Sequence, residues 1–274
     1  MRTGRTRAIG LVLPDLTNPF FPALAQAVEN KARSFGLMVC LIDSQGRPDS
    51  ESDGFALLTQ NAVDGVIWCP LGSRLPAHIK NLSRPVVLID RPRLGYDAVH
   101  SNYQMGGRLL AEHALKMGHT RVGMLSGPQN LESARQRRDG FVSAYPKTIK
   151  IAWEVSVGFD GVLSQDAVDA LKRPKKVTLI VAGNDLIAIN AIRCLSEHGV
   201  KVPDDISITG FDNISWAEFV TPRLTTVAQS VGDIGAKAVE LIRERMSGAE
   251  IPNRVILFNV ALIERDSVKR LGAS

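Results

Sequence analysis

Short apolar runs alternate with longer amphipathic segments along nearly the whole of this 274-residue chain. In the first ninety residues, each β-rich run is followed by a stretch in which apolar residues recur at helical spacing. The predicted strands are residues 8–13, 38–43, 65–69 and 86–89, and the predicted helices are residues 19–35, 50–60 and 75–81. This alternation indicates βαβ units, so the sequence predicts a parallel sheet with helices on both faces.

The same alternation restarts near residue 106. It predicts helices at residues 106–116, 133–144, 164–171, 185–198 and 234–246. It predicts strands at residues 121–125, 149–155, 178–181, 206–209, 225–227, 255–258 and 261–263. We therefore expect an α/β chain of two similar lobes, each a parallel sheet flanked by helices, with a ligand cleft between the lobes.

The positive charge of the chain is concentrated at its start. The formal net charge is +5, and Arg2, Arg5 and Arg7 supply three of these charges, which leaves +2 for the rest. The sequence thus has a basic arm but no basic domain. No apolar run approaches the ~18 residues of a membrane span, and no signal peptide opens the chain, so we expect a cytoplasmic protein without membrane partners.

The three cysteines are odd in number and widely spaced. Cys40, Cys69 and Cys194 each lie in an apolar stretch. This pattern is typical of buried thiols in a reducing compartment.

Polar and aromatic side chains follow the predicted strands at their carboxyl ends, where open parallel sheets bind their ligands. The candidate site residues are Asn18, Phe20, Phe21, Asp90, Arg91, Arg137, Phe159, Asn184, Asp212 and Gln229. Carboxylates, amides and guanidinium groups can bind vicinal hydroxyls in pairs, and phenylalanine can cover the apolar face of a sugar ring. The set fits a small polyhydroxylated ligand, and it would also accept a purine, which stacks and offers donors and acceptors at its edges.

Taken singly, these candidates have simpler structural interpretations. An asparagine before a helix is more often a cap than a ligand contact. A neighbouring Asp-Arg pair can be a surface ion pair, and a Phe-Phe pair can belong to the core. Arg135, Arg137 and Arg138 can form a solvated helix face. The functional interpretation is favoured because all of the candidates fall at the same end of their strands.

Enzyme signatures are missing from the sequence. It has no phosphate-binding loop of the G-x-x-x-x-G-K-[ST] type, no G-x-G-x-x-G after a strand and no G-x-S-x-G elbow. His113 and His119 are six residues apart, so they lack the spacing of metal ligands on one helical face. We expect no catalytic residue, no metal and no cofactor.

With these residues in place, the chain resembles the effector-binding core of the lac/gal repressor family. The resemblance runs from about Arg7 to Ser267. It rests on IGLVLPDLTNPFF at 9–21, VDGV at 63–66, PVVLIDR at 85–91, GHTR at 118–121, AGND at 182–185, VPDDISITGFD at 202–212, LTTV at 224–227 and ERDS at 264–267. The family implies a periplasmic-binding-protein-like fold of type I and a homodimeric transcription regulator.

Within the family, the candidate residues are most similar to those of ribose repressors and the related ribose receptors. The resemblance implies that Asn18, Phe20 and Phe21 contact the sugar, and that Asp90 with Arg91 holds ring hydroxyls. It implies further sugar contacts for Arg137, Phe159, Asn184, Asp212 and Gln229. These matches favour a pentose such as ribose over a purine.

The resemblance also implies a domain organisation. Residues 1–7 resemble the linker that follows a DNA-reading head, which this chain lacks. Residues 8–99 and 229–256 would form the N-terminal lobe, and residues 100–228 and 257–274 the C-terminal lobe, joined by crossover strands. The segments 145–157 and 171–178 are shorter than is usual in the family, and both lie in the second lobe.

The expected function is therefore the sensing core of a sugar-responsive repressor that binds operator DNA as a dimer through the head. One alternative is a periplasmic sugar receptor of a transporter, which would have the same fold. Another is the same regulator with a purine effector, and a third is a sugar-modifying enzyme. The missing signal peptide, the unpaired cysteines and the repressor-like ending ERDS favour the regulator.

Overall fold

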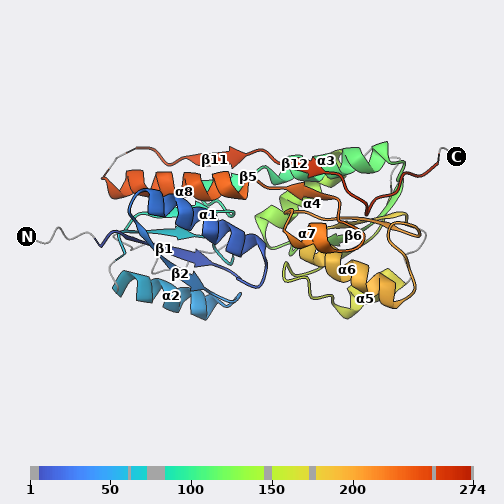
Figure 1. Cartoon of the computed structure of the whole chain (residues 1–274), viewed down its shortest axis with the longest axis horizontal. Helices are drawn as coiled ribbons and strands as arrows, with labels where there is room; N and C mark the ends of the chain where they lie inside the picture. The colour runs from blue at the N-terminus through green and yellow to red at the C-terminus, as the bar shows by residue number, and fades with distance from the viewer. Residues whose placement is uncertain are drawn as a thin grey trace, which may run out of the picture. The chain divides into compact units, whose positions relative to one another are not determined.

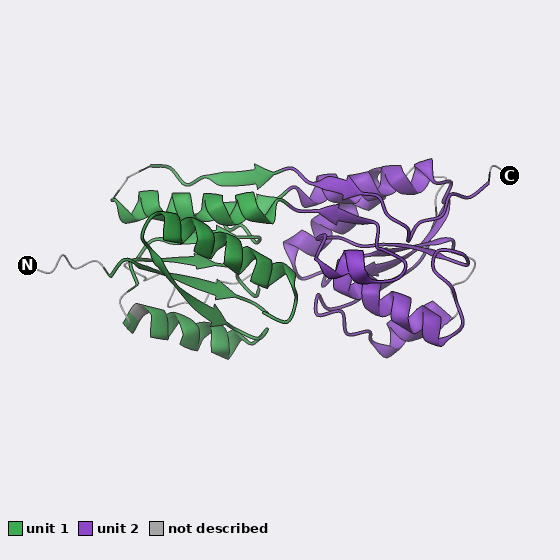
Figure 2. Ribbon diagram, in the orientation of Figure 1, with its two compact units in different colours: residues 1–101, 230–258 green, residues 102–229, 259–274 purple. Residues whose placement is uncertain are grey.

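The structure is a computed structural model that describes residues 6–60, 63–72, 84–144, 150–172, 177–248 and 251–272. The chain forms two compact units, coloured separately in Figure 2. Unit 1 contains Met1–Ser101 and Ser230–Phe258, and unit 2 contains Asn102–Gln229 and Asn259–Ser274. Each unit is thus built from two separate segments, and the chain passes between the units three times.

Unit 1 is centred on a six-stranded sheet in the order β11-β5-β4-β3-β1-β2, in which every neighbouring pair is parallel. The strands are β1 (Ala8–Leu13), β2 (Met38–Asp43), β3 (Gly65–Trp68), β4 (Val86–Ile89), β5 (Asp97–Ser101) and β11 (Val255–Phe258). All residues of β1 and β3 are buried. This burial explains their near-continuous apolar sequences, since a parallel sheet is covered on both faces.

Among the described residues, three helices cover this sheet: α1 (Phe20–Ser34), α2 (Pro48–Gln60) and α8 (Val231–Met246). In Figure 1, α1 and α8 lie on one face of the sheet and α2 lies on the other. The two helices on the shared face approach closely at Gly235, where an added Cβ would lie 2.7 Å from the Cβ of Ala27. The absence of a side chain at this position allows α8 to lie against α1.

Unit 2 contains a four-stranded parallel sheet in the order β7-β6-β8-β9. Its strands are β6 (Arg121–Ser126), β7 (Lys150–Ser156), β8 (Leu179–Ala182) and β9 (Ser207–Thr209). A separate antiparallel pair joins β10 (Thr226–Ala228) to β12 (Ala261–Ile263). The helices are α3 (Tyr103–Lys116), α4 (Glu132–Ala144), α5 (Gln165–Lys172), α6 (Asp185–Glu197) and the short α7 (Trp216–Phe219).

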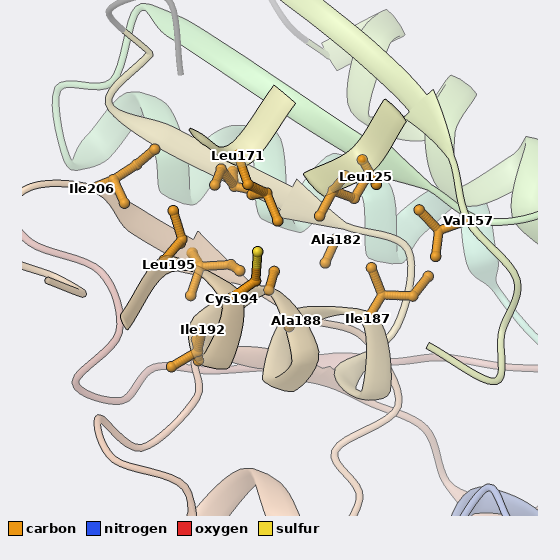
Figure 3. Close-up of a cluster of buried hydrophobic side chains, with 14 of the residues drawn as sticks. Leu125, Val157, Leu171, Ala182, Ile187, Ala188, Ile192, Cys194, Leu195 and Ile206 are labelled. Atoms are coloured by element: carbon orange, nitrogen blue, oxygen red, sulfur yellow. The ribbon is translucent and has the colours of Figure 1, made fainter. Parts of the chain in front are cut away.

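The apolar face of α6 builds one core of unit 2. Figure 3 shows Ile187, Ala188 and Cys194 of this helix facing Leu125 and Ala182 of the sheet. The helix begins after Asn184, whose side-chain oxygen accepts a hydrogen bond from the N–H of Ile187. This is the N-cap that the sequence predicts, and it satisfies one of the free N–H groups of the first turn.

Helices α3 and α4 lie in direct backbone contact. An added Cβ at Gly107 would lie 2.0 Å from the carbonyl oxygen of Arg137, and one at Gly140 would lie 2.1 Å from that of Gln104. Only glycine fits at either position, because real Cβ atoms do not approach backbone oxygens so closely. The two glycines therefore determine where α4, and with it Arg137, lies against α3.

We predict that Gly107→Ala will lower the free energy of unfolding by about 1–3 kcal/mol, because overpacking must separate the two helices. Urea unfolding measures the effect. Gly232→Ala is the matched control, since no atom lies within 4 Å of a Cβ at that helical position. The control should keep or slightly raise stability, and an equal loss in both variants would contradict the packing argument.

The predicted α/β architecture of two helix-flanked parallel sheets is confirmed. Helix α3 begins at Tyr103 rather than at residue 106, because the side chain of Asn102 accepts a hydrogen bond from the N–H of Met105 and caps the helix there. Helix α8 likewise begins at Val231 rather than at residue 234. Strand β5 was expected only as a crossover, α7 was not predicted, and the helix predicted at residues 75–81 lies outside the described residues.

Two of the three cysteines are buried as predicted, but the prediction for the third is wrong. Cys69 and Cys194 are buried, whereas Cys40 is exposed. Its strand, β2, stands at the edge of the sheet, where β1 is its one partner among the described strands. An edge strand and a central strand can have equally apolar sequences. The sequence alone therefore did not show that Cys40 lies in an edge strand.

Candidate functional site

Arg137 is the centre of a polar cluster within unit 2. Its side chain is 9% exposed, and its Nη1 donates a hydrogen bond to the carbonyl oxygen of Gly183 at 2.8 Å. Its Nη2 lies 3.0 Å from Oδ1 of Asp212. A buried guanidinium with a carbonyl and a carboxylate as partners keeps its charge and has a fixed orientation.

Three aromatic rings surround this guanidinium. Its central carbon lies 4.0 Å from the ring centre of Phe211 and 5.1 Å from those of Tyr103 and Phe159. These distances are within the range of cation–π attraction. A small cavity of about 20 Å³ lies beside the guanidinium and is lined by Gly127, Gly183 and Phe211 among others. Arg137 is therefore held by its surroundings at the wall of this cavity.

Asp212 lies in the loop after β9 and has an unusual backbone. Its φ is 111°, a conformation that L residues rarely adopt outside functional sites. Its N–H donates to the carbonyl oxygen of Val227 at 2.8 Å, and its Oδ1 accepts a hydrogen bond from Nε2 of Gln229 at 2.7 Å. The structure thus brings together Arg137, Asp212 and Gln229, which the sequence places at three separate strand ends.

Asn184 and Phe159 also meet in unit 2, although their contact differs from the expectation. The side-chain oxygen of Asn184 caps α6, and its Nδ2 donates to the carbonyl oxygen of Phe159 at 2.9 Å. The simpler interpretation of Asn184 as a cap is therefore correct. Asn184 also positions Phe159, and its direct contact with a ligand stays a prediction.

The three arginines of α4 have different environments. Arg135 is exposed, Arg137 is buried, and Arg138 donates to Glu154 of the neighbouring strand at 2.7 Å. The hydrogen bond with Glu154 raises the pKa of Arg138. The alternative of one solvated arginine face is thus wrong for Arg137.

In unit 1, Asp90 and Arg91 follow β4 and are both buried, with 7% and 5% of their surface exposed. Asp90 has a φ of 66°, so it is a second candidate aspartate in the left-handed region. Arg91 lies 3.5 Å from Oδ2 of Asp90 and donates a hydrogen bond to the carbonyl oxygen of Pro70 at 2.5 Å. Burial excludes the interpretation as a solvent-exposed ion pair.

Cys69 directly follows β3, the neighbouring strand of the same sheet. Its Sγ lies 3.8 Å from Oδ2 of Asp90. Burial raises the pKa of this thiol far above its usual range, and the nearby carboxylates of Asp90 and Glu51 oppose ionisation further. Cys69 is thus a neutral neighbour of Asp90 and has none of the character of a reactive thiolate.

Asn18 lies in the loop between β1 and α1, and Phe20 and Phe21 are the first two residues of α1. The side-chain oxygen of Asn18 accepts a hydrogen bond from the N–H of Phe20 at 3.1 Å. The two phenylalanine rings meet edge to face, with centres 5.2 Å apart. Strands β1, β3 and β4 are neighbours in a parallel sheet, so their carboxyl ends lie on the same side of the sheet. Asn18 and Asp90, which follow β1 and β4, therefore both lie at this carboxyl end.

Tyr103 and Phe211 are site residues that the sequence did not single out. Tyr103 opens α3, and Phe211 directly precedes Asp212. Both resemble ordinary core aromatics in a sequence, and both are indeed buried. The adjacency of Phe211 to a candidate aspartate was the available signal, whereas nothing distinguished Tyr103.

A metal cluster and a membrane-spanning helix are both missing from the part of the chain that the structure describes. Across the described ranges, no three metal-ligating side chains come together. None of the described helices combines the length and apolar character that crossing a membrane requires.

Comparison with known proteins gives the family. The family described as "Periplasmic binding protein-like domain" matches residues 111–268. The transcriptional regulator DegA of Bacillus subtilis is 31% identical over 281 residues, covering 98% of this chain and 82% of DegA. The transcriptional repressor PurR of Aliivibrio salmonicida is 29% identical over 283 residues, covering 99% of this chain and 84% of PurR.

Solved structures agree with these relatives. A LacI family regulator of Enterococcus faecium with bound ribose is 28% identical, with a TM-score of 0.83 over 97% of this chain and 100% of that one. A periplasmic binding protein/LacI regulator of Alkaliphilus metalliredigens, complexed with D-xylulofuranose, is 25% identical, with a TM-score of 0.86 over 96% of this chain and 99% of that one. The relatives are regulators and not enzymes. The chain therefore belongs to the LacI family of transcriptional regulators, within which it corresponds to the effector-binding core.

Proposed function

We propose that this chain is the sensing core of a sugar-responsive repressor, with ribose or a similar monosaccharide as its effector. The observation that carries the proposal is the cluster of Arg137, Asp212 and Gln229 beside the aromatic rings of Phe159 and Phe211. Guanidinium, carboxylate and amide groups match vicinal hydroxyls, and aromatic faces match the C–H face of a sugar ring. The ribose-bound relative of Enterococcus faecium supports this choice.

The second half of the proposed site is in unit 1. Asn18, Phe20, Phe21, Asp90 and Arg91 offer the same combination of planar polar groups and phenylalanine rings. We propose that both sets of residues serve one effector molecule. Substitutions in either unit should then weaken the same binding event, which is a direct test of the assignment.

A purine effector is the second candidate. It is favoured by the relatives named PurR, which are 28% to 30% identical to this chain. Aromatic rings beside a buried arginine would also suit a planar base. Hypoxanthine and ribose are therefore the two probes that any binding experiment must compare.

We propose that the effector acts by changing the population of two arrangements of a homodimer, and so its affinity for operator DNA. A ligand shifts such an equilibrium only by its different affinities for the two states. The DNA is expected to bind through a head outside this chain, in the cytoplasm. Exposed apolar side chains are candidates for the dimer contact: Met38 and Leu41 on β2, and Trp216 and Phe219 on α7.

The test is calorimetric titration of this chain with D-ribose, hypoxanthine, D-glucose and D-xylose. We expect ribose alone to bind. A ligand at one hundred times its Kd adds about 2.7 kcal/mol of stability, so thermal unfolding gives an independent readout. Binding of hypoxanthine alone would replace the sugar by a purine, and silence of all four would refute both effectors while leaving the family assignment unchanged.

A further inference from the structure

A fully buried carboxyl group lies behind the polar cluster of unit 2. Asp185 is the first residue of α6 and is 0% exposed. Buried carboxyls are rare without a function or a partner, because burial penalises their charged form. Asp185 is not among the residues proposed to touch the effector, so its burial needs another explanation.

The contacts of Asp185 tie three segments together. Its Oδ1 accepts a hydrogen bond from the hydroxyl of Thr226 on β10 at 2.5 Å. Its Oδ2 accepts one from the N–H of Ile214 at 2.9 Å, and its own N–H donates to the carbonyl oxygen of Phe211 at 2.8 Å. An added Cβ at Gly210 would lie 2.1 Å from Oδ1, so the loop also packs directly on the carboxyl.

These contacts enclose Asp212 from both sides. Phe211 precedes it and Ile214 follows it, and both are bonded to Asp185. Between them, Asp212 and Asn213 have φ values of 111° and 55°, a backbone that persists only when its surroundings enforce it. The third partner, Thr226, precedes Val227, whose carbonyl oxygen receives the N–H of Asp212.

We propose that Asp185 is a positioning residue that sets effector affinity by holding Asp212 in place against Arg137 and Gln229. The inference rests on the proposed effector site, which it deepens. Asp185 itself touches no effector. Its backbone N–H holds the loop at Phe211, and its carboxyl holds the loop at Ile214 and binds Thr226. Together these bonds keep the Asp212 carboxylate in the orientation that Arg137 and Gln229 share.

The proposal includes a pH dependence. Burial raises the pKa of Asp185 well above its usual range, and the charge of Asp212 raises it further. The hydrogen bonds from Thr226 and Ile214 and the charge of Arg137 act in the opposite direction. Two further charged side chains lie near this loop. Arg265 donates hydrogen bonds to the side chain of Asn213, the residue after Asp212, and to Glu218.

Protonation changes what Asp185 does. The protonated acid donates its O–H to Thr226 and still accepts from Ile214, so the loop is held without a second negative charge beside Asp212. The ionised acid places two carboxylates near one guanidinium, and their repulsion displaces Asp212. Effector affinity should therefore fall as the pH rises through the titration of Asp185.

Asp185→Asn tests this mechanism, because the amide has the shape of the protonated acid. Its oxygen can accept from Ile214 and its NH2 group can donate to Thr226. We expect the affinity of the wild type for D-ribose to fall as the pH rises through the titration of Asp185, and that of the variant to change less. Histidine titrations contribute equally to both proteins, so the difference between the two profiles isolates Asp185.

Asp185→Ala removes both hydrogen-bond acceptors and should weaken ribose binding by about tenfold. Thr226→Val removes only one hydroxyl and is the milder second variant, should the alanine fail to fold. Asp166→Asn is the matched control, because Asp166 also lies in the first turn of a helix of unit 2 but is exposed. It should leave both affinity and pH profile unchanged.

A readout without ligand separates this inference from the choice of effector. Hydrogen exchange of the Asp212 and Ile214 amides should accelerate in Asp185→Ala and stay slow in Asp166→Asn. If no sugar binds the wild type, the proposed effector fails, but accelerated exchange would still support the positioning role. Unchanged exchange, or identical pH profiles of wild type and Asp185→Asn, would overturn it.

Discussion

Replacing Arg137 with alanine is expected to weaken D-ribose binding by about a hundredfold or more, because hydrogen bonds to a charged group contribute about 1.5–3 kcal/mol each. The guanidinium is already oriented by Gly183, Asp212 and the ring of Phe211 before any ligand arrives. Effector binding therefore costs little conformational entropy at this side chain. Calorimetric titration of the variant measures the loss.

The substitution also removes the cation beside Asp212, which would leave a buried carboxylate unpaired and destabilise unit 2. Thermal unfolding must therefore accompany the titration. Arg135→Ala, on the exposed side of the same helix, is the control and should bind normally. Wild-type affinity in a folded Arg137→Ala protein would refute the proposed site.

A large effect on stability is expected at Asp97. Its side chain is fully buried, and it accepts hydrogen bonds from Nε of Arg245 and from the N–H of Arg254, both at 2.7 Å. It thereby connects β5 with the end of α8 and the approach to β11. Asp97→Asn should lower the free energy of unfolding at neutral pH by about 2 kcal/mol, because it removes the buried counter-ion of Arg245 and Arg254, whose side chains are 17% and 37% exposed.

This effect should disappear in acid. Burial alone would raise the pKa of Asp97, but the hydrogen bonds from Arg245 and Arg254 and their charges hold it below its usual range. A carboxyl with a lowered pKa stabilises the fold above its unfolded pKa of about 3.9, and this contribution is lost as the pH falls through the folded value. Urea unfolding at neutral and at acid pH should therefore show the difference from wild type shrinking.

Asp53→Asn is the control for this series. Asp53 is an exposed carboxylate of unit 1, so its substitution should change stability by less than about 0.5 kcal/mol at either pH. A pH-independent loss in Asp97→Asn would mean that shape, and not the ion pair, determines the effect.

The order of strands and helices could be predicted because period-2 and period-3.6 patterns are local properties of a sequence. The limits of the elements depended on single side chains, such as Asn102, which starts α3 three residues before the apolar pattern begins. Strand β5 was harder to recognise because its sequence, DAVHS, places Asp97 and His100 in a buried strand. The two polar residues are tolerated because Asp97 pairs with arginines and His100 bonds the carbonyl oxygen of Ser101.

Candidate site residues could be predicted from their place after strands, whereas their partners could not. The pairing of Arg137 with Asp212 joins residues 75 positions apart, and only the packing of α3 on α4 and the loop after β9 establishes it. Tyr103 and Asp185 were missed for the same reason. An aromatic residue and an acidic residue at helix starts are common, and their function depends on what the fold brings to them.

The division of both units into separate chain segments has a consequence for synthesis. During synthesis, strands β1 to β5 emerge from the ribosome before α8 and β11. The sheet of unit 1 therefore lacks one edge strand and one covering helix until residue 258 has emerged. Unit 2 in turn waits for β12 to pair with β10. Neither unit can therefore complete its core until these late segments are made, and a single cut can excise neither unit as an intact module.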